Sequence, residues 1–147
     1  MATSYSPDLV RCVREYLDSK GFQSQFHHPD GVFVFSIKVE SRLKAVTVYI
    51  DVGSEGFTVI SMPYTPVPVS GAAVRRVSVY FSSINAVLSE GKFEINPPDN
   101  EMVFSLPLYC GDKLPTVEYV KAIVEHAIRI WSKYGDAVMD VVFKQSM

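Results

Sequence analysis

The stretch that decides the fold is GKFEINPPDNEMVFSLPL, at residues 91–108. Residues 92–96 and 102–108 place apolar side chains at alternate positions, and the Pro97-Pro98-Asp99-Asn100 segment between them is typical of a turn. This arrangement predicts a β-hairpin. The side chains that would share its inner face are all apolar: Phe93, Ile95, Met102, Phe104 and Leu106. The hairpin therefore needs other apolar elements to cover it.

A long amphipathic helix is predicted after the hairpin. Thr116 suits the N-cap, Glu118 lies in the first turn and Lys133 in the last, which favours a helix to about Tyr134, before Gly135. Residues 136–143 fit either a further helical turn or a terminal strand.

The apolar side chains of this helix span about half its circumference, wider than the usual stripe of roughly 100°. One interpretation is a helix wedged deeply into a sheet. The other divides the arc, so that part faces the core and part meets a second chain. The core part would be Val120, Val124, Ala127, Ile128 and Trp131, and the candidate interface residues are Tyr119, Ile123 and Ile130. If a monomer left the interface residues in water, each aliphatic one would forfeit about 1.5–3 kcal/mol.

The residues before the hairpin predict two more helices and a three-stranded meander. Ser6, Pro7 and Gly21 are good boundary residues for a first helix, and Ser70 caps a second that would run to about Ser89. Residues 32–39, 45–52 and 57–62 alternate as strands, and residues 22–28 could add a short edge strand. One apolar and one mixed face suggest an antiparallel sheet covered on a single side. The predicted fold class is α+β, with the order α-βββ-α-ββ-α in a single domain, residues 1–147.

Composition narrows the class of protein. The 147 residues are 48% hydrophobic and 20% charged, which indicates a compact globular domain. Fourteen basic and sixteen acidic residues give a net charge of -2, too balanced for general attraction to nucleic acid. Neither a signal-peptide pattern nor an apolar run of roughly 20 residues is present, so we expect no membrane partner and a cytoplasmic location.

Few residues of the sequence suggest catalysis or metal binding. His27 and His28 are adjacent on an extended segment, so their side chains point apart and cannot share one metal ion. Carboxylate pairs such as Asp99 with Glu101 show no contrast in environment that acid–base catalysis would need. Cys110 and His126 would form a thiol–base pair only if folding brought them together, and an incidental cysteine is the alternative. We expect no catalytic residue, no metal and no cofactor.

The order of elements resembles a YbjN-type domain. GKFEIN at residues 91–96, DNEMVFSLPL at 99–108 and the helix from Thr116 carry this resemblance most clearly. That family is similar in fold to type III secretion chaperones. The resemblance implies a small cytoplasmic protein that forms a homodimer and is of a sensory-transduction or stress-linked regulatory kind. The secretion chaperones hold segments of other proteins along exposed strands and helix grooves. One departure is the Pro-rich connector at residues 64–69, which could cover an edge or remodel a groove.

Three functional hypotheses follow. The first is a non-enzymatic cytoplasmic protein-binding module, chaperone-like or regulatory, that acts as a homodimer through Tyr119, Ile123 and Ile130 and engages a protein partner. Its partner could use the mixed sheet face around Thr47, Tyr49 and Asp51. The second is a small-molecule sensor with a pocket between the sheet and the helices. The third is a cryptic thiol enzyme centred on Cys110 and His126.

Overall fold

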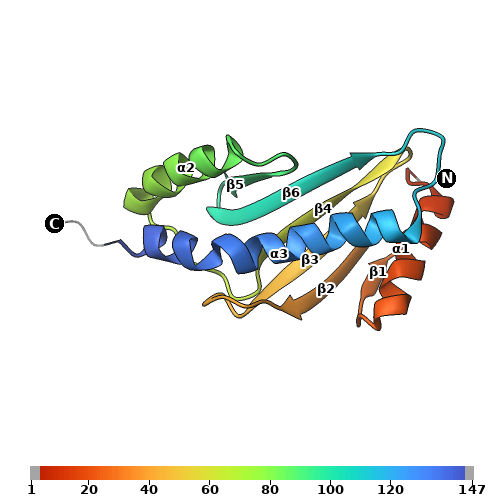
Figure 1. The fold of residues 1–147 in the computed structure, drawn as a ribbon, viewed down its shortest axis with the longest axis horizontal. Helices are drawn as coiled ribbons and strands as arrows, with labels where there is room; N and C mark the ends of the chain where they lie inside the picture. The colour runs from red at the N-terminus through yellow and green to blue at the C-terminus, as the bar shows by residue number, and fades with distance from the viewer. Residues whose placement is uncertain (1–3, 145–147) are drawn as a thin grey trace.

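A six-stranded antiparallel sheet with three helices makes up the computed structural model, which describes residues 4–144 (Figure 1). The strand order across the sheet is β1-β2-β3-β4-β6-β5. The strands are β1 (Gln25–His27), β2 (Val32–Lys38), β3 (Ala45–Val52), β4 (Gly56–Pro63), β5 (Lys92–Asn96) and β6 (Glu101–Tyr109), and the helices are α1 (Pro7–Lys20), α2 (Gly71–Asn85) and α3 (Val117–Val142). The predicted α+β class and element order are confirmed, with β1 as the short edge strand suggested for residues 22–28.

One face of the sheet is buried beneath the helices because the inward positions of the strands are apolar. Phe33 and Phe35 of β2, Val46, Val48 and Ile50 of β3, and Phe57 and Val59 of β4 are all buried. The alternate residues of the same strands are only half-buried or exposed. Figure 1 shows α3 crossing the sheet, with α1 beside its beginning and α2 beside its end. The predicted one-sided cover therefore holds.

Helix α3 continues past Gly135 to Val142, so the predicted end near Tyr134 is wrong and residues 136–142 are helical. Gly135 is required by close packing. A Cβ built on it would lie 2.6 Å from Ser41 Oγ and 3.0 Å from Leu43 Cδ1. The turn between β2 and β3 therefore packs directly on the helix backbone. Arg42 of the same turn pairs with Asp136 and Asp140 and holds the turn there.

Helix α2 ends at Asn85, four residues before the predicted end at Ser89. The side chain of Asn85 bonds to strand β5 at this end of the helix. Its Oδ1 accepts from the Phe93 backbone N–H at 2.8 Å, and its Nδ2 donates to the Phe93 carbonyl at 2.9 Å. The amide thus occupies both main-chain groups of Phe93 on the outer edge of β5, which draws the end of the helix against the sheet.

Helix α1 joins α3 through Glu125. The buried Tyr16 hydroxyl donates to Glu125 Oε2 at 3.1 Å, and Lys20 and Arg129 pair with the same carboxylate. Burial and the adjacent carboxylate raise the pKa of Tyr16 well above its usual value, so this hydroxyl stays protonated and keeps donating.

A buried hydrogen-bond chain joins α3 to β4. Trp131 Nε1 donates to Ser61 Oγ at 2.9 Å, and the Ser61 hydroxyl donates to the Ala127 carbonyl at 2.8 Å. Trp131 and Ser61 are both fully buried. A buried indole N–H without an acceptor is costly, so Ser61 fulfils a specific requirement of the core.

Replacing Gly135 by alanine should destabilise the protein by about 1–3 kcal/mol, although alanine favours a helix by about 1 kcal/mol. The new methyl group would collide with Ser41 and Leu43. Gly71→Ala is the matched control, because nothing lies within 4 Å of its added Cβ. Denaturant unfolding measures both variants, and equal or greater stability of Gly135→Ala would contradict the close packing.

A double-mutant cycle should detect the Trp131–Ser61 bond. Ser61→Ala leaves the indole N–H unsatisfied and is expected to cost about 1–3 kcal/mol in unfolding free energy. In a Trp131→Phe background, which has no N–H to satisfy, the same change should cost about 1 kcal/mol less. Additive effects of the two changes, measured by urea unfolding, would show that the bond contributes nothing.

Candidate functional site

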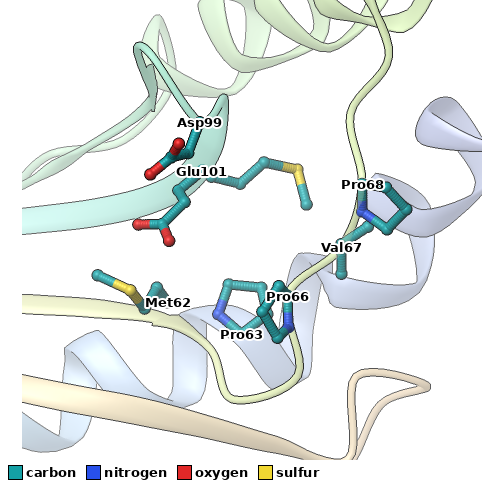
Figure 2. A pocket seen from close by; sticks show the side chains of 8 residues that line it. Met62, Pro63, Pro66, Val67, Pro68, Asp99 and Glu101 are labelled. Carbon is teal, nitrogen blue, oxygen red and sulfur yellow. The ribbon is translucent and has the colours of Figure 1, made fainter.

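The strongest candidate site is a pocket of about 350 Å³ at one end of the sheet. It lies between the end of β4, the Pro-rich connector and the beginning of β6 (Figure 2). We call it the β4–β6 pocket. It is lined by Met62, Pro63, Pro66, Val67, Pro68, Asp99, Glu101 and Met102.

The pocket exists because β4 and β6 are not paired along their whole lengths. The last two residues of β4 and the first three of β6 lie beyond the paired region. The pairing of the two strands stops at Ser61 opposite Phe104. Continuing the same register would place Pro63 opposite Met102, but this pair is not formed. Proline has no N–H to donate to a neighbouring strand, so one of the two bonds of this pair cannot form. On its other side, β4 still pairs with β3 as far as Pro63.

The main-chain groups of Met102 face the resulting gap. Successive residues of a strand direct their N–H and C=O groups to opposite sides. Asn85 binds the N–H and C=O of Phe93, so these groups point to the outer edge of the sheet. Phe93 and its partner Phe104 are therefore a non-hydrogen-bonded pair. The N–H and C=O of Phe104 consequently point the other way, toward β4. Met102, two residues earlier, directs its groups the same way. There Pro63 offers no donor, and the strands are no longer paired.

The rim of the pocket is acidic. Figure 2 shows the carboxylates of Asp99 and Glu101 on the β6 side, opposite Met62 and Pro63. Both acidic residues are exposed, and in the described part of the chain neither has a basic side chain within ion-pair distance. Asn100 Nδ2 donates to the Val69 carbonyl at 3.4 Å, which ties the turn to the connector. The site thus combines an apolar floor, free carboxylates and strand groups without strand partners.

The three predicted interface residues differ in how far they are buried. Ile123 and Ile130 are 5% and 4% exposed and belong to the core of the monomer, whereas Tyr119 is 47% exposed. The premise that a monomer leaves all three in water is therefore wrong for the two isoleucines. The wide apolar arc reflects a helix sunk deeply between the sheet and its neighbouring helices. Tyr119 lines a shallow hollow with Tyr109 and Leu114, which are also exposed.

Cys110 and His126 do not form a thiol–base pair in the structure. Burial raises the pKa of the Cys110 thiol, which disfavours the thiolate that a nucleophile needs. His126 Nε2 is buried without a hydrogen-bond partner, and its ring packs edge-on against Phe104. Cys110 lines the hollow beside Tyr119, whereas His126 lines a separate groove with Arg129 and Lys133. This arrangement gives no support to the thiol enzyme.

The described residues, 4–144, contain neither a cluster of metal-ligand side chains nor a membrane-spanning helix. No group of three or more His, Cys, Asp or Glu side chains there could hold a metal ion. None of the helices in that range is long and apolar enough to cross a membrane. Between α3 and the sheet, where the alternative hypothesis of a small-molecule sensor places a pocket, the space holds packed side chains, including Trp131 against Phe93 with ring centroids 5.0 Å apart.

The sequence alone did not identify the β4–β6 pocket, although it contained a signal. The Pro-rich connector was predicted to cover an edge or remodel a groove, and it does form one wall of the pocket. In the sequence, Asp99 and Glu101 form only a carboxylate pair in a turn. Their role at the rim depends on where β4 ends, which no local pattern reveals.

Comparisons with known proteins identify the fold. No protein-family model and no curated protein matches this sequence. Among solved structures, YbjN from E. coli, described as a proposed transcription regulator, is 18% identical with a TM-score of 0.59, over 90% of this chain and 88% of that one. The ExsC–ExsE complex matches at 16% identity with a TM-score of 0.56, over 86% of this chain and 92% of that one. The chain therefore has a YbjN-type, type III secretion chaperone-like fold, as its sequence resemblance predicted.

Truncating two residues of α3 should separate core from surface. Ile123→Ala removes buried side-chain atoms and is expected to cost about 2–4 kcal/mol of unfolding free energy. Tyr119→Ala, on the exposed part of the same helix, should change stability by about 0.5 kcal/mol or less when measured on dilute protein. Similar losses for both variants in chemical denaturation would contradict this placement.

Proposed function

We propose that this chain is a non-enzymatic protein-binding module of chaperone-like or regulatory type, which acts in the cytoplasm as a homodimer. The observation that carries the proposal is the β4–β6 pocket, where an apolar floor, free carboxylates and unpaired strand groups lie together. Such a combination suits a segment of polypeptide, which offers main-chain groups as well as side chains. The likeness in fold to a protein solved in complex with a second protein also supports it.

The two edges of the sheet differ in how open they are to strand addition. At β5, the Asn85 side chain already occupies the outer main-chain groups of Phe93. At the opposite edge, β1 pairs with only residues 32–34 of β2. Residues 35–38 of β2 extend beyond β1, so this half-strand is a second place where an extended partner could pair.

The homodimer is proposed to form around Tyr119. Tyr109, Leu114 and Tyr119 are 77%, 54% and 47% exposed and line one hollow at the beginning of α3. Exposed aromatic side chains that lie together are typical of protein contact surfaces. Ile123 and Ile130 would then support the surface from within the core.

Light scattering across a tenfold dilution tests the homodimer. A dimer of the 16.4 kDa chain should have twice that mass, and Tyr119→Glu should shift it toward the monomer. Tyr64→Glu is the matched control, since Tyr64 is 60% exposed in the connector, away from this hollow. A wild-type mass of 16.4 kDa at every concentration would overturn the homodimer.

Protein binding itself is tested by reconstitution. A protein that co-purifies with this chain should be expressed separately and should form a complex of fixed stoichiometry with it in light scattering. If purified candidates form no complex, and the chain instead turns over a substrate, the non-enzymatic binding module is the wrong proposal.

A further inference from the structure

We infer that the β4–β6 pocket binds an extended segment of a partner protein that carries a lysine or arginine beside apolar residues. This inference rests on the proposed protein-binding function and specifies the chemistry of the bound segment. It is argued from the main-chain groups, the charge and the apolar floor of the pocket.

The main-chain groups favour an extended segment. The β4–β6 ladder ends after Ser61, so the main chain of Pro63 at the pocket has no strand partner on the β6 side, while Met102 opposite it is only 2% exposed. An extended peptide presents N–H and C=O groups at the spacing of a strand, so it can follow the half-buried end of β4 where the ladder stops. A small rigid metabolite has no such repeating pattern.

The charge of the rim favours a basic side chain. Some acidic residues of the fold have basic partners, since Asp136 and Asp140 pair with Arg42, and Glu125 pairs with Lys20 and Arg129. Asp99 and Glu101 have no ion pair of this kind, and the pocket lining contains no basic residue. A lysine or arginine of the bound segment would supply the missing cation.

The floor favours apolar neighbours of that cation. Met62 is half-buried and has an unbranched, adaptable thioether side chain, which fits apolar groups of different shapes, and the core residue Met102 lines the pocket beside it. Pro63, Pro66 and Pro68 restrict the backbone around them, so the wall is largely formed before binding.

The same charges disfavour a second copy of this chain as the occupant. In a two-fold symmetric contact, a surface meets its own copy. Asp99 and Glu101 would then face two further carboxylates across the interface, and like charges in close contact oppose binding. A basic segment of another protein has the complementary charge.

Methionine methyl NMR tests the inference directly. The probes are three capped heptapeptides in which valine alternates with lysine, glutamine or glutamate. With ¹³C-methyl methionine in the protein, the lysine peptide should shift the signals of Met62 and Met102, assigned through Met→Leu variants. Met139, which packs against the core from α3, is the internal reference and should not shift.

Two matched variants isolate the role of the rim. The double change Asp99→Asn with Glu101→Gln should weaken lysine-peptide binding about fivefold to tenfold, because exposed ion pairs contribute modestly. Asp112→Asn with Glu118→Gln removes the same charge beyond the far end of β6 and should leave the affinity unchanged. Pro63→Val restores an N–H opposite Met102, so it should extend the ladder and reduce binding of the lysine peptide.

The alternative outcomes are distinct. Equal shifts with all three peptides, or none with any peptide, would overturn the inference. Shifts of Met62 and Met102 on concentrating the protein alone would identify a second copy as the occupant and also overturn it. If a reconstituted partner complex forms with unchanged affinity in the Asp99→Asn, Glu101→Gln variant, the inference fails while the protein-binding function stands.

Discussion

The seating of α3 on the sheet is the constraint on which the rest of the structure depends. Trp131 lies at the centre of the core, and its indole N–H must find an acceptor there. The Ser61 hydroxyl of β4 accepts this bond and donates a second one to the Ala127 carbonyl. Helix and strand therefore have one favourable register. One turn further along α3, Gly135 lets the β2–β3 turn lie against the helix backbone. Together these contacts determine how deep and how far along the sheet the helix lies.

This seating also decides where binding can occur. Because α3 fills the covered face of the sheet with side chains, the hollows of the described chain lie at its surface. Ser61 is the last residue of β4 that pairs with β6, and Pro63 follows two residues later. The same strand therefore anchors the core through one residue and opens the β4–β6 pocket through the other. A rigid core beside a gap in the ladder is a suitable arrangement for holding a flexible segment without reorganising the fold.

The ends of the sheet reinforce this arrangement. An unpaired edge strand exposes main-chain groups to unwanted partners, and the side-chain amide of Asn85 covers those of Phe93. The acidic rim adds selectivity by charge, since neither Asp99 nor Glu101 has a basic side chain within ion-pair distance in the described part of the chain. Shape, main-chain groups and charge thus converge on one end of the sheet, whereas the thiol and imidazole of Cys110 and His126 are kept apart in separate hollows.

The sequence by itself determined the elements and their order, because alternation in the strands, the caps at Ser6, Ser70 and Thr116, and the amphipathic arc of α3 are local patterns. It also predicted the chaperone-like fold. Only the tertiary structure decided that Gly135 is a packing residue and that Ile123 and Ile130 belong to the core, since both depend on elements distant in the chain. The β4–β6 pocket also depends on elements that are distant in the chain. A proline can end a strand ladder anywhere, and only the register between β4 and β6 places Pro63 opposite Met102.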